Sequence, residues 1–244
     1  DISQSPREGG RIRGGEVSYE EVVAAAVKSG SRIIAYTYTE PTIFFEYALD
    51  IARPAGDRGL KNIFVTNGYI SAPALDEIGP YLDGANVDLK SFRDEFYKRI
   101  CGGRLQPVLD TIVKMQEMGI WMEVTTLVIP GYNDSEEELS DIAEFLAGIS
   151  PEIPWHVSAF YPTYRLTSAP PTPVETLRRA RRIGRKAGLR YVYTGNIPGD
   201  EGENTFCHRC GKEIVGRTGF RVNHVNLSDG NCRYCGAPAA GIWG

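Results

Sequence analysis

The sequence lacks several features that would point to particular classes of protein. No apolar run approaches the ~20 residues of a membrane-spanning helix, and the polar first residues do not resemble a signal peptide. The 27 Lys and Arg residues are outnumbered by 31 Asp and Glu, so a broad positive field for nucleic acid is not expected. Five cysteines in 244 residues are too few for a disulfide scaffold. With 42% hydrophobic and 24% charged residues, the composition is that of an ordinary globular protein.

Segments typical of strands and of helices alternate through most of the chain. Short runs rich in β-branched and aromatic residues predict six strands, at residues 32–39, 62–66, 84–89, 121–129, 155–161 and 191–193. Between them lie stretches with apolar residues at helical spacing. This α/β alternation predicts parallel βαβ units, in a barrel or an open doubly wound sheet. Such folds carry their chemistry at the carboxyl ends of the strands.

Three of the predicted helices begin with residues typical of helix N-termini. In a capping box, a Ser or Thr side chain accepts a hydrogen bond from the N–H three residues later, and a Glu at that later position returns one. The sequence predicts two such boxes and a third capped start, formed by Ser18 with Glu21, Ser135 with Glu138, and Thr172-Pro173 with Glu175. Residues 1–17 are rich in glycine and poor in apolar residues, which predicts a loop.

The composition changes near Gly195, after which two Cys-x-x-Cys pairs occur 21 residues apart, formed by Cys207, Cys210, Cys232 and Cys235. Two such turns present four thiolates to one tetrahedral ion, which stabilises a module too small to bury a large core. We expect structural zinc, with iron in a rubredoxin-like site as the alternative. The sequence thus divides into residues 1–195 and a metal-binding module at 196–244. Metal-binding thiols also indicate a reducing, cytoplasmic location.

Motifs at the predicted strand ends resemble a known pattern. They are Tyr38-Thr39-Glu40-Pro41, Thr66-Asn67-Gly68, Asp88-Leu89-Lys90, Ile129-Pro130-Gly131-Tyr132-Asn133-Asp134 and Pro154-Trp155-His156. In this order they look like radical S-adenosylmethionine (radical SAM) enzymes related to the pyruvate formate-lyase activase. Three further segments resemble, more closely, the AmmeMemoRadiSam radical SAM family: Asp1-Ile2-Ser3-Gln4, the run VTTLVIPGYNDSEEE and the ending GENTFCHRCG…CRYCG…GIWG.

The resemblance implies a partial (β/α)₆ barrel that binds SAM beside a [4Fe–4S] cluster held by a Cys-x₃-Cys-x₂-Cys motif. Electron transfer from the cluster would cleave SAM to methionine and a 5′-deoxyadenosyl radical, which abstracts hydrogen from a substrate. The resemblance does not identify the substrate. If the enzyme is activase-like, the substrate is a protein. It also implies an electron donor such as flavodoxin or ferredoxin, and it points to Memo-like and AMMECR-type proteins as partners.

The same resemblance implies roles for residues at the strand ends. Tyr38, Thr39 and Glu40 stand where related enzymes hold the methionyl amine, and the carboxylate of Glu40 suits this ammonium. Asp88 and Lys90 match residues near the SAM carboxylate and ribose. The other implied cofactor-binding residues are Asn67 and Gly68 after the third barrel strand, Thr125 and Thr126 at the ribose and carboxylate contacts, and His156 beside the adenine.

The sequence departs from the family pattern where the cluster would bind. No Cys-x₃-Cys-x₂-Cys motif occurs in the 244 residues, and no strand is predicted before the first helix. We expect the motif and the first barrel strand to precede Asp1, and the 244 residues alone to be inactive. Thr39 replaces a glycine of the wider motif, and Val65 stands in place of an aspartate. Near Thr125 the activases carry an arginine that this chain lacks, and Glu123 stands two residues earlier.

Two other functions stay open on the residues alone. A non-radical (β/α) barrel lyase or hydrolase would use Lys90 and Asp88, since a desolvated lysine acts as a nucleophile. A zinc-ribbon module would instead bind nucleic acid or a protein, together with the basic helix predicted at residues 178–190. Aromatic residues do not interleave with the arginines of that helix, which disfavours nucleic acid. Cys101 stands alone, and we interpret it as a small buried hydrophobe.

Overall fold

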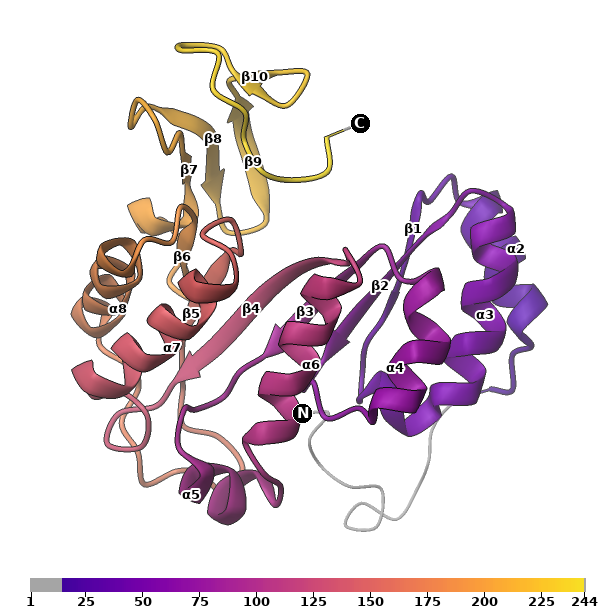
Figure 1. The fold of residues 1–244 in the computed structure, drawn as a ribbon, viewed down its shortest axis with the longest axis horizontal. Coiled ribbons are helices and arrows are strands. Elements are labelled where there is room, and N and C mark those ends of the chain that lie inside the picture. The colour runs from indigo at the N-terminus through magenta and orange to yellow at the C-terminus, as the bar shows by residue number, and fades with distance from the viewer. Residues whose placement is uncertain (1–14, 244) are drawn as a thin grey trace.

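The chain folds around one sheet of six parallel strands. In the computed structural model, which describes residues 15–243, the strands lie side by side in chain order (Figure 1). They are β1 (Ile33–Tyr36), β2 (Lys61–Thr66), β3 (Gly84–Asp88), β4 (Trp121–Val128), β5 (Trp155–Ala159) and β6 (Val192–Gly195). The parallel α/β fold predicted from the sequence is therefore confirmed. β1 is shorter than predicted because the backbone of Tyr38 has a positive φ of 24°, which does not continue a strand.

Some of the sequence-based expectations concern residues outside the described range. The Asp1–Gln4 segment that contributes to the family resemblance lies there, as does most of the loop predicted for residues 1–17. The cluster motif and the strand expected before Asp1 lie outside it as well. Within the described residues, β1 and β6 do not pair with each other, so the sheet is open rather than closed.

Helices cover one face of the sheet. In β4, Met122 and Val124 are buried, whereas the alternating Glu123 and Thr125 lie on a more open face. The longer helices are α2 (Tyr19–Lys28), α3 (Phe45–Asp57), α4 (Ala72–Ile78), α6 (Gln106–Glu117), α7 (Glu136–Ile149) and α8 (Val174–Ala187). Shorter helical segments are η1 (Pro41–Phe44), η2 (Gly79–Tyr81), α5 (Asp94–Phe96), η3 (Tyr97–Cys101) and η4 (Glu201–Glu203). None of the described helices has the length and apolar character needed to cross a membrane.

The predicted helix starts are only partly confirmed. Ser18 and Glu21 form the reciprocal capping box at the start of α2. Ser135 caps α7, but Glu138 does not return the bond; its buried carboxylate accepts hydrogen bonds from the Ser91 hydroxyl and from the Phe92 N–H. At α8, the N-cap residue has no side-chain hydrogen bond. The Thr172 hydroxyl is used elsewhere, accepting from the Phe160 N–H at 2.9 Å and donating to the Val128 carbonyl.

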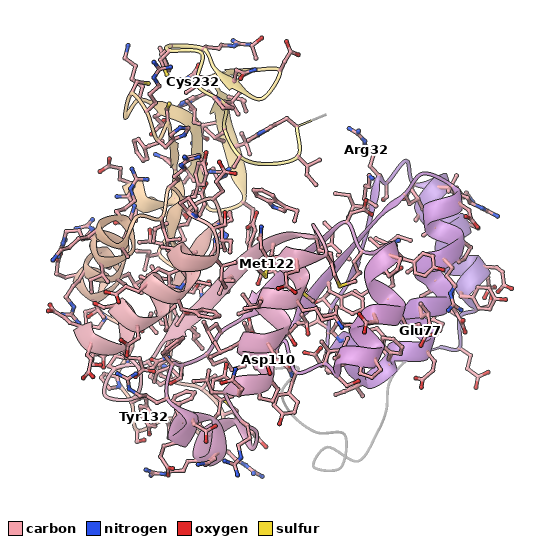
Figure 2. The ribbon with its side chains drawn as sticks, in the orientation of Figure 1. Arg32, Glu77, Asp110, Met122, Tyr132 and Cys232 are labelled. Carbon is pink, nitrogen blue, oxygen red and sulfur yellow. The ribbon has the colours of Figure 1, made fainter. Side chains whose placement is uncertain are left out.

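The C-terminal segment, which follows β6 and comprises residues 196–243, forms a small sheet with its own core. β7 (Thr205–Phe206), β8 (Glu213–Thr218) and β9 (Arg221–Val225) pair antiparallel, and β10 (Leu227–Ser228) pairs with β11 (Asn231–Cys232). Ile214, Val215 and Leu227 pack there with two of the cysteines. Cys232 lies at the end of this segment that is remote from the main sheet (Figure 2). The segment also contacts the main sheet, since the Tyr193 and Thr205 hydroxyls are hydrogen-bonded at 2.9 Å.

A glycine allows α8 to pack closely against the sheet. A Cβ atom at Gly184 would lie 2.9 Å from ring atoms of the fully buried Trp155 and 2.9 Å from a methyl group of Val192. We predict that Gly184→Ala lowers the free energy of unfolding by about 1–3 kcal/mol, because overpacking outweighs the better helix propensity of alanine. Urea denaturation followed by tryptophan fluorescence measures this change.

Gly148→Ala is the matched control, because Gly148 lies inside α7 and a Cβ atom there would meet no neighbouring side chain within 4 Å. Alanine there should leave stability unchanged or raise it by roughly 0.5–1 kcal/mol. Equal stability of the two variants would show that α8 does not pack as tightly as the structure indicates.

Candidate functional site

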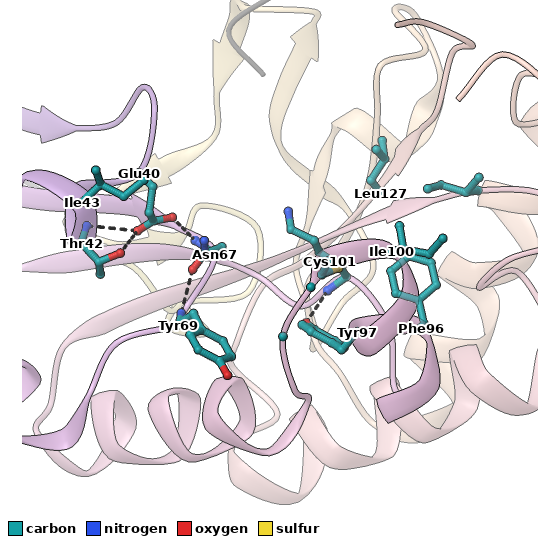
Figure 3. Close-up of a pocket in the computed structure, with 14 residues that line it drawn as sticks. Glu40, Thr42, Ile43, Asn67, Tyr69, Phe96, Tyr97, Ile100, Cys101 and Leu127 are labelled. Atoms are coloured by element: carbon teal, nitrogen blue, oxygen red, sulfur yellow. Dashed lines mark hydrogen bonds between the residues drawn. The ribbon is translucent and has the colours of Figure 1, made fainter. Parts of the chain in front are cut away.

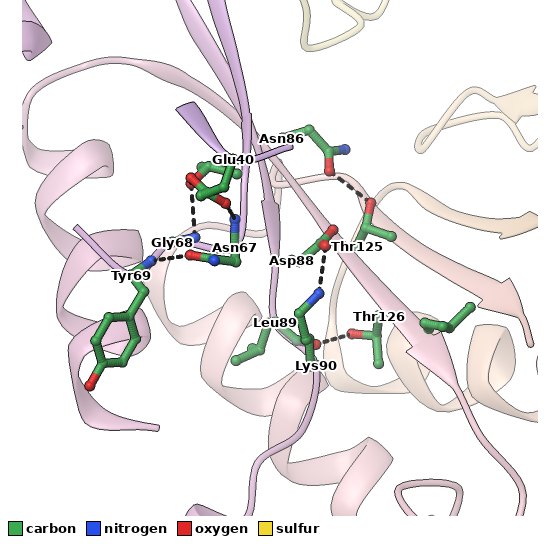
Figure 4. Close-up of polar contacts among 12 residues, drawn as sticks. Glu40, Asn67, Gly68, Tyr69, Asn86, Asp88, Leu89, Lys90, Thr125 and Thr126 are labelled. Carbon is green, nitrogen blue, oxygen red and sulfur yellow. Dashed lines mark hydrogen bonds and ion pairs between the residues drawn. The ribbon is translucent and has the colours of Figure 1, made fainter. Parts of the chain in front are cut away.

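Glu40 carries a buried carboxylate between the ends of β1 and β2. Its Oε1 accepts hydrogen bonds from the Thr66 hydroxyl at 2.7 Å, the Thr42 hydroxyl at 3.1 Å and the Thr42 N–H at 3.3 Å. Its Oε2 accepts from the Asn67 N–H at 2.7 Å (Figure 4). No Lys, Arg or His among the described residues pairs with Glu40. Among the residues that the structure describes, Oε2 therefore has one hydrogen-bond partner and can accept a further hydrogen bond from a ligand.

The turn after β2 places Asn67 and Gly68 beside Glu40. The Asn67 Oδ1 accepts from the Tyr69 N–H at 2.8 Å, and the Gly68 N–H donates to the Thr66 hydroxyl at 3.1 Å. Gly68 has a φ of +71°, and a Cβ there would lie 2.8 Å from a Val87 methyl group. Only glycine fits this turn without displacing its neighbours. The structure thus brings Glu40, Asn67 and Gly68 together, as expected from the sequence.

Lys90, just after the end of β3, provides a cation that lines the same cavity as Glu40. The Lys90 Nζ lies 2.7 Å from the Asp88 Oδ2, and both side chains are 38% exposed. The Lys90 N–H donates to the hydroxyl of Tyr97 at 3.0 Å, which fixes the backbone there. On the neighbouring strand, the Thr125 hydroxyl donates to the Asn86 Oδ1 at 3.0 Å (Figure 4). Thr125, in the middle of β4, is in register with Asp88, so these two residues lie beside Lys90 at the carboxyl end of β3.

Asn133 holds the segments after β3 and β4 in place. Its side-chain amide donates to the Lys90 carbonyl at 2.6 Å and to the Leu127 carbonyl at 2.9 Å, while its Oδ1 accepts from the Ile129 N–H at 2.6 Å. The residue is 1% exposed, so these bonds are shielded from water. The Ile129–Asp134 motif therefore has a structural role in which Asn133 positions the Lys90 backbone.

Thr126 does not lie with Asp88, Lys90 and Thr125 on the open face of the sheet. It is completely buried, and its hydroxyl donates to the Leu89 carbonyl at 2.9 Å and accepts from the Trp155 Nε1 at 3.0 Å. Neighbouring residues of a strand point to opposite faces, so Thr126 faces the helices while Thr125 faces the open side. The expectation that both threonines contact SAM is corrected here for Thr126.

A cavity of about 480 Å³ lies between the Glu40 region and Lys90 (Figure 3). Asn67, Tyr69 and the η3 turn complete its wall. Tyr38 and Thr39 are exposed and do not line it. Cys101 lies on this wall and is exposed, which corrects the interpretation of this residue as a buried hydrophobe. Partial burial still raises the pKa of its thiol, although the positive charge of Lys90 acts in the opposite direction. The cavity thus offers a carboxylate from one side and an ammonium from the other.

His156 lines a different cavity. Its Nε2 lies 2.7 Å from the Glu123 Oε2, and its ring stacks on Tyr193 with centroids 5.0 Å apart. Burial alone would raise the pKa of Glu123, but the hydrogen bond and the charge of His156 lower it. This second cavity, of about 510 Å³, is also lined by Arg217 and Phe220 of the C-terminal segment.

The sequence did not identify Tyr193, Arg217 and Phe220 as lining residues. For Glu123, the available signal is its spacing of two from Thr125, which places both side chains on the open face of β4. For Arg217 and Phe220 no local signal exists, because their contact with the main sheet depends on how the two parts of the chain pack.

The four paired cysteines meet in the C-terminal segment. Their sulfur atoms all lie within 4.8 Å of one another, as expected for ligands of one tetrahedral ion. Gly211 and Gly236 follow the second cysteine of each pair with a φ of +71°, which permits the tight turns. Burial would raise the pKa of Cys207, but the N–H groups of Cys210 and Arg209 stabilise the thiolate and lower that pKa to about 7.

Comparison with known proteins agrees with this architecture. The profile of the Radical SAM superfamily matches residues 4–146. An uncharacterized protein of Methanocaldococcus jannaschii is 42% identical over 238 residues, which cover 96% of this chain and 70% of that protein. The pyruvate formate-lyase 1-activating enzyme of Escherichia coli is 22% identical over 200 residues, covering 74% of this chain and 81% of the enzyme.

Among solved structures, Streptococcus suis SuiB bound to S-adenosylmethionine is similar in fold, with a TM-score of 0.61 and 14% identity. The match covers 76% of this chain and 45% of SuiB. The parallel sheet, the polar strand ends and the matched profile lead to one conclusion. The chain belongs to the Radical SAM superfamily and is related to the pyruvate formate-lyase activating enzymes.

Proposed function

We propose that the cavity between Glu40 and Lys90 binds the methionyl part of SAM. The observation that supports this most strongly is the position of Glu40, a buried carboxylate without a cationic partner among the described residues and with Oε2 available to a donor. The SAM ammonium supplies the missing positive charge. Because Thr66, Thr42 and Asn67 already orient the carboxylate, little reorganisation is needed when the ligand arrives.

Lys90 and Thr125 extend this proposal along the open face. Lys90 is half-exposed in the ion pair with Asp88, so its ammonium is available to the SAM carboxylate or ribose. Thr125 lies in the middle of β4, in register with Asp88, and its hydroxyl is suited to a ribose contact. His156 is in register with Thr125 on β5, so SAM would reach it only by extending from the first cavity toward the second.

The [4Fe–4S] cluster of the proposed reaction is not held by these 244 residues, which contain no Cys-x₃-Cys-x₂-Cys motif. A cluster held by such a motif would supply the electron for reductive cleavage of SAM. The residues of this chain bind and orient SAM. The hydrogen bonds of the Lys90 backbone with the Asn133 amide and the Tyr97 hydroxyl fix this wall of the cavity.

The substrate that we propose is a protein, as in the activating enzymes to which the chain is related. We further propose the AmmeMemoRadiSam system as its context, with Memo-like and AMMECR-type proteins as partners and a flavodoxin or ferredoxin as electron donor in the cytoplasm. For the cluster of Cys207, Cys210, Cys232 and Cys235 we propose a structural zinc ion, because the four sulfurs are close enough to leave no open ligand position.

Glu40→Gln tests the SAM proposal. Loss of a buried charge-assisted hydrogen bond of roughly 1.5–3 kcal/mol should weaken SAM binding by about 10- to 150-fold. Calorimetry on the full-length protein with a reconstituted cluster gives the dissociation constant. Glu46→Gln, the same change at an exposed position of α3, should bind SAM like the wild type. Equal affinity of the Glu40 and Glu46 variants would disprove the proposed ammonium site.

Lys90→Met tests the opposite wall of the cavity. Removing the ammonium while keeping the aliphatic stem should weaken SAM binding by roughly 5- to 30-fold, because the ligand loses a charged contact of about 1–2 kcal/mol. Formation of 5′-deoxyadenosine without substrate is the second readout and should fall in parallel at low SAM concentration. Lys98→Met, at an exposed site in the η3 turn, is the control. Unchanged affinity in Lys90→Met would place SAM away from β3.

Cys210→Ser tests the metal site. The variant should lose its one zinc per chain, and amide exchange should become fast across β7, β8 and β9 while β1 to β6 stay protected, because the ion supplies much of the folding free energy of this segment. Elemental analysis and hydrogen exchange measure both effects. Cys101→Ser should keep the metal, since Cys101 lies on the wall of the Glu40–Lys90 cavity and not among the four paired cysteines. A stoichiometric disulfide and no metal in the native protein would contradict the proposal.

A further inference from the structure

The turn between β8 and β9 brings an exposed aromatic ring to the second cavity. Phe220 lines this cavity together with Glu123 and His156 of the main sheet, yet its side chain is fully exposed, at 111% of the reference area. Phe220 is followed in β9 by the exposed Val222 and Val225, so several apolar side chains rather than one are open to water beside this cavity. In Figure 1 the β8–β9 turn is directed toward the main sheet. The cavity is therefore open toward this hairpin.

The edge of β9 is unpaired among the described residues. The small sheet has the order β7-β8-β9, and no other described strand pairs with the outer side of β9. All five residues of β9 are exposed. An open edge presents a row of backbone N–H and C=O groups that can pair with an extended peptide. The edge starts directly at the cavity, because β9 begins at the residue after Phe220.

The hairpin is positively charged in an otherwise acidic chain. Residues 217–225 contain Arg217 and Arg221 and no carboxylate, although the chain carries a net charge of −4. The Arg217 Nη1 donates to the Glu203 carbonyl and to the Thr205 hydroxyl, and its guanidinium lies over the Tyr193 ring. Among the described residues, neither arginine forms an ion pair with a carboxylate. Carboxylates also lie nearby, since Glu203 accepts from the Gly219 N–H at 3.1 Å and lines the cavity with Glu123. The exposed Arg221 is therefore the cation of the hairpin that an acidic side chain can reach.

We infer that the β8–β9 hairpin and the adjoining cavity dock an extended, acidic segment of a partner protein. The segment pairs with the edge of β9, an apolar side chain covers Phe220, and an acidic side chain faces Arg221. Backbone pairing favours a peptide over a nucleic acid, because phosphates cannot use the strand edge and two cations are few for a polyanion. The inference rests on the proposed function, since it identifies the substrate of that reaction as a polypeptide.

Peptide selection tests this inference. A display library of random peptides of about twelve residues is selected against the full-length protein, and the most enriched peptide is labelled with fluorescein as the probe. We expect enriched sequences to be acidic and free of internal proline. Fluorescence anisotropy should show the affinity falling by about 10-fold or more in Phe220→Ala and in Arg221→Glu. Arg58→Glu, the same charge reversal at the exposed end of α3, should bind the peptide like the wild type.

Hydrogen exchange locates the bound peptide. The amides of β9 should exchange more slowly when the peptide is present, while those of β1 remain unchanged. The inference is overturned if no sequence is enriched, if both hairpin variants bind the probe as tightly as the wild type, or if the protection lies away from β9. It is also overturned if a labelled single-stranded oligonucleotide binds in place of the peptide and loses affinity in Arg221→Glu.

SAM binding is measured in the same variants to separate the two proposals. Arg221 lines neither cavity, so Arg221→Glu should bind SAM like the wild type. If wild-type protein binds the peptide through the hairpin but does not bind SAM, the proposed function fails and the docking surface stands. If SAM binds and the hairpin variants leave peptide affinity unchanged, the docking surface fails alone.

Discussion

The buried carboxylate of Glu40 ties the end of β1 to the end of β2. Thr66 and Asn67 belong to the β2 end, and both donate to Glu40 at 2.7 Å. A buried carboxylate without such donors would be costly, so the turn after β2 must adopt the conformation that supplies them. Gly68 permits that turn because its φ is positive. The wall of the first cavity thus follows from the need to satisfy one charge.

Two buried side chains from the segment after β4 fix the opposite wall. Asn133 donates to the carbonyls of Lys90 and Leu127, and Glu138 accepts hydrogen bonds from Ser91 and Phe92. These bonds connect the loop after β3 to the start of α7. The Lys90 side chain is therefore held on a rigid backbone even though it is half-exposed. A ligand placed between the two walls would meet groups that are already oriented.

Much of the fold could be predicted from the sequence because hydrophobic periodicity and strand-end polarity are local properties. The six strands of the main sheet were predicted in this way, and the meeting of the four cysteines was predicted from the spacing of the two Cys-x-x-Cys pairs. The finer errors have long-range causes. Glu138 leaves the capping box because Ser91 and Phe92, 47 and 46 residues away, offer it better donors. Thr126 was grouped with Thr125, although strand alternation places neighbours on opposite faces.

The contacts between the two parts of the chain could not be predicted from the sequence at all. Arg217 and Phe220 line the cavity with His156 only because the small sheet packs beside β6, and no spacing in the sequence encodes that arrangement. For the same reason, the motif containing His156 could be matched to a family pattern, but its separation from the Glu40–Lys90 cavity emerged only from the structure.

The account depends on a cation taking up the remaining acceptor position of Glu40, and one structure tests this directly. A crystal structure of the full-length protein with SAM bound should place the methionyl nitrogen about 2.7–2.9 Å from the Glu40 Oε2, with Asn67 still donating to the same oxygen. A bound SAM whose amine is held by other residues, with no ligand atom near Glu40, would contradict the account.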